Sequence, residues 1–496
     1  MHLRLSGTFY IPRFIHAGGQ NGCRKGIPMN ASLEHLHHSA RRPLAACFAL
    51  LFAATASSAA IANVDSAPKP RPAVAVTTCD DDGPGSLRAT IAAAASGDMV
   101  DLSALTCGTI SLTTGFIGIA QDDLTLVGPG ASALAIDAGS ASGVLRHTGT
   151  GTLSLTGLTI SHGVYTGATP HGGCLYSAAN IELANSTVSY CQVNGSGTMA
   201  LGGGVYAGGD LTLTSSLVTQ NVVHAIGAPA HGGGLYVHGN LDAEYTMISY
   251  NTTYAGPISG GVGGGAVVAG STQVRHSSFY YNGAYAVGGL YTYGDVTLDS
   301  STIARNGASH AAGMRALFVT GSPVATIVNS TIANNHAFAT VGGLNLIIPA
   351  TISNSTIAFN QANSGLGGVL MSNYTLDLES TIIANNTGFG DPDDFDAYGS
   401  PTITGANNLV IASSAPLPPD TIPADPMLGT LADNGGATQT IALNAGSPAI
   451  DAGNDVANLG SDQRGPGFPR VAGARADIGA FEVEGDDDIF ANGFDP

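Results

Sequence analysis

The chain has 496 residues, of which 69 are glycine and none is tryptophan, and its formal net charge is −19 at pH 7. Because only 10% of the residues are charged, the composition indicates a glycine-rich β protein and excludes an acidic disordered chain. No lysine follows Lys69, and this acidic balance argues against nucleic acid or an anionic membrane surface as a partner.

The first element is a leader. Arg41 and Arg42 precede an apolar run at residues 44–56 that is too short to span a bilayer, and Ala-x-Ala cleavage options end at Ala56 and Ala62. We therefore expect residues 1–66 to be a leader with a signal peptide. The mature protein is then exported to the extracellular space or the cell surface and has no transmembrane segment. Met29 stays open as an alternative start.

Four cysteines follow the leader, namely Cys79, Cys107, Cys174 and Cys191. An even number in an oxidising compartment predicts two disulfides, and three connectivities are open. We favour the local one, Cys79 with Cys107 and Cys174 with Cys191. The second pair requires two corners of the fold to bring their Cα atoms within ~7 Å.

Residues 67–150 are expected to form an N-terminal cap and the first strands. Ser86 suits a helix N-cap, and Leu87 and Ile91 lie on one face of the short helix that should follow. Such a helix would cover the unpaired strand edge of a stacked fold. The run Gly-Pro-Gly-Ser-Leu-Arg at 83–88, followed by apolar runs at 100–102 and 124–130, resembles the N-terminal cap of exported bacterial β-helix proteins.

Residues 151–390 repeat one sequence about eight times. The copies include GGCLYSAANIELANSTVSYC from Gly172 and GGGVYAGGDLTLTSSLVTQN from Gly202. Apolar residues alternate with Thr, Ser and Asp, which is the period of strands and not of helices. The copies end on asparagines that can stack as an amide ladder and that suit a left-handed turn: Asn221, Asn251, Asn282, Asn306, Asn335, Asn360 and Asn386.

This repeat predicts an all-β right-handed parallel β-helix, a solenoid with a short N-terminal capping helix and a C-terminal closing segment. A solenoid grows by stacking, so the length demands no second core, and we expect a monomer. The Gly-Gly corner followed by Phe279-Tyr280-Tyr281-Asn282 resembles the Gly-Gly-Ala-(Ile, Leu or Val) and FxxN repeats of bacterial polymorphic outer-membrane proteins. More broadly, the repeat resembles the pectate-lyase-like β-helix superfamily, whose members have many activities.

Two columns of the repeat should point outward. The residue after the inward apolar position is aromatic or polar in most copies, and these side chains are the candidate binding residues: Tyr176, Tyr206, Tyr236, Tyr291 and Arg315. The residue before the ladder position gives a second column that includes Tyr190, Tyr250 and Tyr281. Packing of stacked tyrosines on one another is the alternative to a binding surface.

No catalytic or metal-binding cluster is expected within the repeats. His171, His231 and His310 occupy one frame position at least two strands apart, which is too far to share a zinc ion. The only candidate calcium ligands are four acids just after the last repeat, which lack the spacing of an EF-hand: Asp391, Asp393, Asp394 and Asp396. A solvated acidic loop is the alternative, and no other cofactor is expected.

From residue 391 to 482 we expect a closing domain, followed by an acidic tail at 483–496. Five pieces resemble the domain called choice-of-anchor Q in bacterial surface proteins: Leu428-Gly429, Leu431 to Gly436, Gly446 to Gly453, Asp462 to Gly465 and Asp477 to Glu482. That resemblance implies a secreted or cell-surface protein. Arg464 is expected to pair with Asp451 or Asp477 and to fix the last turn of the solenoid.

Two functions remain open. One is a non-enzymatic, adhesin-like scaffold that binds a polysaccharide or a surface protein, and it is the one we favour. The other is a polysaccharide lyase or glycoside hydrolase, which needs a strong base or two carboxylates in one outward patch. Arg275, Arg305 and Arg315 are the repeat-region arginines that could serve as such a base.

Overall fold

The computed structural model describes residues 73–255 and 260–484. The chain divides into two units, 1–67 and 68–496, and all of the described residues belong to the second. The predicted leader, including the apolar run at 44–56, lies outside the described residues, as does the tail from residue 485. Within the described ranges, no helix has the length and apolar character needed to cross a bilayer.

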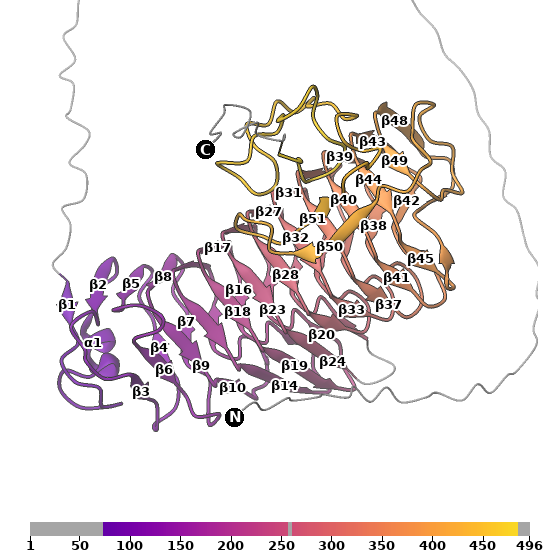
Figure 1. The fold of residues 1–496 in the computed structure, drawn as a ribbon. Helices are drawn as coiled ribbons and strands as arrows, with labels where there is room; N and C mark the ends of the chain where they lie inside the picture. The colour runs from indigo at the N-terminus through magenta and orange to yellow at the C-terminus, as the bar shows by residue number, and fades with distance from the viewer. Residues whose placement is uncertain (1–72, 256–259, 485–496) are drawn as a thin grey trace, which may run out of the picture. The chain divides into compact units, whose positions relative to one another are not determined.

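Parallel strands stack into four long sheets within the described residues, which confirms the parallel β-helix (Figure 1). Sheet A consists of β1 (Val74–Ala75), β2 (Asp98–Asp101), β5 (Leu124–Val127), β8 (Thr152–Thr156), β12 (Asn180–Ala184), β17 (Leu211–Thr214), β22 (Leu241–Glu244), β27 (Thr272–Arg275), β31 (Val296–Asp299), β35 (Ala325–Val328), β39 (Ala350–Ser353), β43 (Thr375–Glu379) and β48 (Thr402–Ala406). Sheet B consists of β3 (Thr109–Ser111), β6 (Ala135–Asp137), β9 (Thr159–Ser161), β13 (Thr187–Ser189), β18 (Leu217–Thr219), β23 (Met247–Ser249), β28 (Ser278–Tyr280), β32 (Thr302–Ala304), β36 (Thr331–Ala333), β40 (Thr356–Ala358), β44 (Ile382–Ala384) and β49 (Leu409–Val410).

The other sheets complete each turn. Sheet C consists of β4 (Ile117–Ile119), β7 (Leu145–His147), β11 (Leu175–Ser177), β16 (Val205–Ala207), β21 (Leu235–Val237), β26 (Ala266–Val268), β30 (Leu290–Thr292), β34 (Met314–Leu317), β38 (Leu344–Ile347), β42 (Val369–Ser372) and β47 (Phe395–Tyr398). Sheet D consists of β10 (Val164–Tyr165), β14 (Gln192–Ser196), β19 (Val222–Ile226), β24 (Thr252–Ala255), β29 (Gly283–Ala284), β33 (Gly307–Ala308), β37 (His336–Ala337), β41 (Gln361–Ala362), β45 (Thr387–Gly388) and β46 (Asp391–Pro392). In this sheet, β46 is antiparallel to β45. Two small sheets remain, formed by β15 (Ala200–Leu201), β20 (Ala230–His231) and β25 (Gly261–Val262), and by β50 (Leu428–Ala432) and β51 (Thr440–Leu443).

The core fills the space between the sheets. On sheet A, Leu211 and Leu213 point inward and are buried, whereas Thr212 and Thr214, which alternate with them, point outward and are exposed. Equivalent residues pair in register from strand to strand, as Leu211 pairs with Leu241. The period-2 pattern of the repeat therefore places one apolar layer on the next at the spacing of neighbouring strands, ~4.8 Å.

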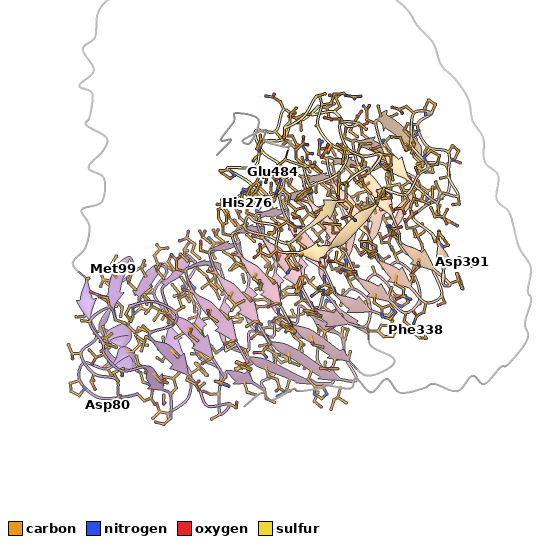
Figure 2. The ribbon with its side chains drawn as sticks, in the orientation of Figure 1. Asp80, Met99, His276, Phe338, Asp391 and Glu484 are labelled. Carbon is orange, nitrogen blue, oxygen red and sulfur yellow. A yellow bond between two sulfur atoms is a disulfide. The ribbon has the colours of Figure 1, made fainter. Side chains whose placement is uncertain are left out.

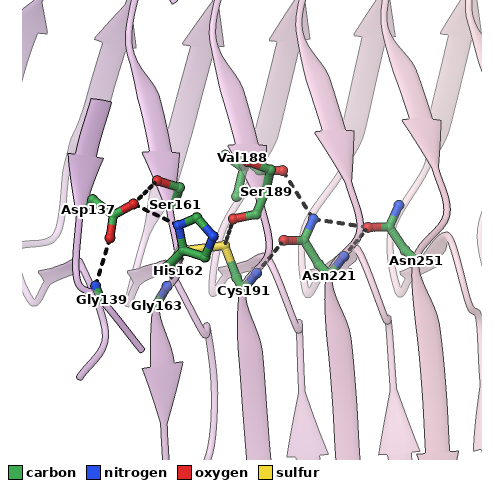
Figure 3. The surroundings of a disulfide bond; sticks show 11 residues. Asp137, Gly139, Ser161, His162, Gly163, Val188, Ser189, Cys191, Asn221 and Asn251 are labelled. Atoms are coloured by element: carbon green, nitrogen blue, oxygen red, sulfur yellow. Dashed lines mark hydrogen bonds and ion pairs between the residues drawn. A yellow bond between two sulfur atoms is a disulfide. The ribbon is translucent and has the colours of Figure 1, made fainter. Parts of the chain in front are cut away.

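The predicted asparagines form a continuous buried ladder. The Asn221 side-chain amide donates to Asn251 Oδ1 at 2.9 Å, and equivalent bonds join every rung through Asn386. At its start, the Cys191 backbone N–H donates to Asn221 Oδ1 (Figure 3). At its end, Asn386 donates to Asp394. Each rung thus satisfies amide groups that would be costly to bury alone.

The expectation that these asparagines adopt the left-handed conformation is wrong. The residue before each asparagine does so instead, with φ of 58° at Gln220, 55° at Tyr250 and 53° at Tyr281. The physical reason is that the asparagine side chain must turn inward to reach the next rung. The preceding residue therefore makes the corner and points its own side chain outward.

The Gly-Gly corners have a steric cause. A Cβ atom at Gly203 would lie 2.2 Å from the carbonyl oxygen of Gly233 in the next turn, so no larger residue fits. At Gly202 the backbone is also left-handed, with φ of 64°. Close stacking, and not conformational freedom alone, explains the glycine pairs.

The N-terminal cap is confirmed. Helix α1 (Leu87–Ala93) begins after Ser86, whose side chain accepts a hydrogen bond from the backbone of Ala89, and it buries Leu87 and Ile91. The favoured disulfide connectivity is also confirmed. Cα atoms lie 6.4 Å apart in the pair Cys79–Cys107 and 5.4 Å apart in the pair Cys174–Cys191.

Residues 426–484 lie along the outer face of sheet B, from β28 to β44 (yellow in Figure 1). Gln463 reaches into this interface and bonds to Thr302 and Thr331. The predicted partners of Arg464 are wrong: Arg464 pairs with Asp462 at 2.8 Å and donates to the Glu482 backbone. The Asp477 carboxylate instead accepts hydrogen bonds from backbone N–H groups of this segment, including that of Asp451.

Candidate binding face on sheet C

One column of equivalent residues runs the length of sheet C. Its positions are fixed by strand register, each residue pairing with the next: Gly118, Arg146, Tyr176, Tyr206, Tyr236, Val267, Tyr291, Arg315, Asn345, Leu370 and Asp396. We call this set the sheet C column. The structure therefore brings all five predicted binding residues into a single line.

Three consecutive tyrosines of the column are stacked. The ring centroids of Tyr176 and Tyr206 lie 5.3 Å apart, those of Tyr206 and Tyr236 lie 5.6 Å apart, and the ring planes differ by 7° and 1°. All three side chains are half-buried. Because their faces meet neighbouring rings, the parts that solvent reaches are the ring edges and the hydroxyl groups.

The hydroxyl groups of Tyr176, Tyr206 and Tyr236 have no hydrogen-bond partner among the described residues, and none of them is a buried atom. Burial raises the pKa of Tyr206 and of Tyr236, so the hydroxyls are protonated at neutral pH. Each can therefore donate and accept a hydrogen bond toward solvent. The column presents these groups at a regular step, one per turn of the solenoid.

A guanidinium precedes the stack. The Arg146 side chain lies over the rings of Tyr165 and Tyr176, with its Cζ atom 3.9 and 4.2 Å from the two centroids, and donates to the His171 backbone oxygen. The His171 ring stacks on Tyr206 at 4.6 Å. Burial, with the Arg146 charge second, lowers the pKa of His171, so this imidazole is neutral. Sequence reasoning missed Arg146, although it stands one repeat before Tyr176.

Beyond Tyr236 the column no longer consists of stacked tyrosines. Val267 is buried, unlike the outward residue that was expected, and Tyr291 packs edge to face against Tyr293 at 4.8 Å. Arg315 and Asn345 follow in register. Burial, together with a hydrogen bond to Tyr291, raises the pKa of Tyr293. This part of the column thus combines the phenol of Tyr291, a guanidinium and an amide, with the phenol of Tyr293 beside it.

The second predicted column lies at another corner of the solenoid. Tyr250 and Tyr281 stack at 4.9 Å, and Arg305 donates to the Tyr281 hydroxyl. Sheet D and its loops carry further exposed rings that sequence reasoning missed, including Phe338 and Phe389, which are 59% and 72% exposed (Figure 2 shows Phe338). In the second column only Tyr250 and Tyr281 stack in consecutive turns, whereas sheet C stacks three tyrosines in succession.

The four acids after the last repeat do not gather as metal ligands. Asp394 is buried, and its two oxygens accept from Asn386 and from the Ala412 backbone. Asp391 is exposed, and Asp396 accepts from Ser414. In the part of the chain that the structure describes, no group of three or more His, Cys, Asp or Glu residues could hold a metal ion.

Sheet A carries most of the outward acids. Arg275 pairs with Asp242 at 2.7 Å and lies 4.0 Å from Glu244, so its charge is already paired with carboxylates. Further along, Asp377 lines a groove with threonines of neighbouring strands and accepts from Thr404. Burial, with the Asp377 charge second, raises the pKa of Glu379, one oxygen of which is buried without a partner.

Among known proteins, the comparisons found similarity only at the level of distant solved structures. No protein-family model matches the sequence, and no curated protein matches it. Among solved structures, the chain is similar to pectate lyase Pel9A (14% identity, 80% of this chain and 91% of that chain, TM-score 0.36) and to a PL6 alginate lyase in complex with a trisaccharide (11% identity, 76% and 91%, TM-score 0.35). At these scores the two neighbours say nothing about the chemistry of this chain.

Proposed function

We propose that this protein is an exported, non-enzymatic scaffold that binds an extended polysaccharide along the sheet C column. The observation that carries the proposal is the row of solvent-facing hydroxyls on Tyr176, Tyr206 and Tyr236. A row with one equivalent group per turn matches a polymer of repeating units better than a compact ligand. Half-buried tyrosines also supply contact area at low entropic cost, because stacking already fixes their rings.

A binding screen tests the proposal. The mature protein is titrated into a panel of cell-wall and capsular polysaccharides, alongside the triple variant Tyr176→Ser, Tyr206→Ser and Tyr236→Ser. We expect at least one polysaccharide to bind and the triple variant to bind at least about tenfold more weakly per folded molecule, a difference of ~1.4 kcal/mol. Equal binding by the folded fraction of the variant would refute the role of the column.

The alternative function is a glycoside hydrolase on sheet A. Asp377 and Glu379 are separated by one residue on β43, and burial raises the pKa of Glu379 while its neighbour lies in a groove. A carboxyl whose pKa is raised by burial, beside a second carboxyl, is the arrangement of a general acid and its partner. Release of reducing ends from any polysaccharide that binds, abolished in Glu379→Gln, would establish this activity instead.

A further inference from the structure

Arg315 is exceptional among the arginines of the described residues. Arg88, Arg275, Arg464 and Arg470 each pair with a carboxylate. Arg146, Arg305 and Arg475 donate hydrogen bonds to protein oxygens. Arg315 makes no hydrogen bond or ion pair with any described residue, although its Nε atom is fully buried.

A second unpaired polar group lies beside it. Asn345 pairs in register with Arg315, one strand further along sheet C, and is 6% exposed. Its Oδ1 atom is buried without a partner. Leaving a buried donor and a buried acceptor unpaired costs about 1–3 kcal/mol each, and more for a charged group, so both positions favour a ligand that satisfies them.

The electrostatic surroundings point to an anion. No position of the sheet C column from Gly118 to Leu370 is a carboxylate, and two are arginines. The outward positions of sheet A, in contrast, include Asp242, Glu244, Asp377 and Glu379. In a chain with a net charge of −19, one face therefore keeps an uncompensated guanidinium.

We infer that Arg315 and Asn345 form a binding site for a sugar that carries an oxyanion next to a free hydroxyl. The oxyanion is either a carboxylate or a sulfate ester. The guanidinium donates to the oxyanion, which can accept two parallel N–H bonds. The Asn345 Oδ1 atom accepts from the neighbouring sugar hydroxyl. Tyr291, the preceding position of the column, flanks the site. The inference rests on the proposed function in that it places an acidic polysaccharide on the sheet C column.

Titration with three polymers tests the site: alginate, which carries carboxylates, heparin, which also carries sulfates, and dextran, which is neutral. Arg315→Gln should weaken binding of the preferred acidic polymer by at least about tenfold and leave dextran binding unchanged. Arg275→Gln is the matched control, because it removes an arginine that is already paired on another face. A preference for alginate or for heparin identifies the anionic group.

Asn345→Asp gives an independent check on folding. The new carboxylate would pair with Arg315 and fill the site from within, so acidic binding should fall as in Arg315→Gln while the thermal midpoint stays at or above that of the wild type. If both variants bind alginate and heparin as tightly as the wild type, the inference is wrong. That result leaves the proposed function standing if the wild type still binds a polymer through its tyrosines.

A monosaccharide probe tests the Arg315–Asn345 site separately from the proposed binding of a polysaccharide. Millimolar glucuronate, with glucose as the neutral control, is added to nitrogen-15-labelled protein, and the Arg315 Nε–H resonance is identified by its loss in Arg315→Gln. A shift with glucuronate alone supports the site even if no polymer binds, in which case only the proposed function falls. Absence of a shift overturns the site, whatever the polymers do.

Discussion

The side-chain amide of Asn386 donates to Asp394 Oδ1 at 2.9 Å, and this bond ends the asparagine ladder of the solenoid. The Asn386 backbone N–H donates to the same oxygen, and the Ala412 backbone donates to the other. Asp394 therefore replaces the rung that the next repeat would have supplied. An acid that was a candidate calcium ligand closes the ladder instead.

Asp394→Ala should destabilise the protein, because the Asn386 backbone N–H loses its acceptor and the side-chain amide keeps only its bonds to the backbone oxygens of Ile357 and Ala384. The buried, unpaired backbone N–H costs roughly 1–3 kcal/mol. Asp394→Asn should cost less, since its amide oxygen can still accept from Asn386. Thermal unfolding followed by circular dichroism at neutral pH compares the two variants. Equal midpoints for both would show that the carboxylate does not cap the ladder.

The disulfide Cys174–Cys191 stands at the other end of the ladder, where Cys191 takes the place of an asparagine. It closes a loop of 17 residues, so the double variant Cys174→Ser, Cys191→Ser should lose about 3 kcal/mol of stability by the chain-entropy argument. Chemical denaturation under oxidising conditions measures this loss. The same scan under reducing conditions should bring the wild type close to the variant.

Acid should weaken the N-terminal cap. Burial opposes ionisation of Asp81, but Arg88 at 2.7 Å and hydrogen bonds from Thr113 and Thr114 outweigh it and hold the pKa of this carboxyl well below its usual range. The stabilisation is present above the unfolded pKa of about 3.9 and is lost as the pH falls below it.

Asp81→Asn should therefore lower stability at pH 7 and reduce the dependence of stability on pH below about 4. Proteolysis of the cap as a function of pH, in the variant and the wild type, measures the effect. A variant with the full acid dependence of the wild type would show that another group controls the cap.

Tyr206 separates packing from binding. Its ring stacks on those of Tyr176, Tyr236 and His171, so Tyr206→Ser should cost roughly 1.5–4.5 kcal/mol, the sum of three aromatic contacts. Tyr206→Phe keeps all three contacts and should leave the thermal midpoint unchanged. Should both variants unfold like the wild type, the stack would contribute nothing to the fold.

Export is expected to depend on residues 41–62. Deleting this segment should leave the protein in the cytoplasm, where the four cysteines of the two disulfides stay reduced. Cell fractionation with a free-thiol label reads out both consequences. Secretion of the deleted protein in oxidised form would contradict the signal-peptide prediction.

Much of the fold could be predicted because the repeat fixes register. Tyr176, Tyr206 and Tyr236 hold one frame position in successive copies, and the structure stacks them accordingly. The Cys174–Cys191 pair was favoured as part of the local connectivity, and the structure brings the two corners to a Cα separation of 5.4 Å. In each case a residue's environment depends mainly on its own turn and the next.

The rest depends on contacts that the repeat does not encode. Arg464 pairs with Asp462 because of the path that residues 426–484 take along sheet B, and that path has no period. Asn345 holds an expected outward position, yet its burial beside an unpaired Arg315 could be found only from coordinates. Arg146 pairs in register with Tyr176 but precedes the predicted repeats at 151–390, so the sequence pattern did not include it.

The most direct test of polysaccharide binding removes only the three column hydroxyls. The triple variant Tyr176→Phe, Tyr206→Phe and Tyr236→Phe keeps the stacked rings, and the matched control is Tyr190→Phe, Tyr250→Phe and Tyr281→Phe in the second column. We predict that isothermal titration with the preferred polysaccharide shows at least about tenfold weaker binding for the first variant, and wild-type binding for the control. Wild-type affinity in the first variant, at an unchanged thermal midpoint, would contradict the proposal that the hydroxyl row of sheet C holds the ligand.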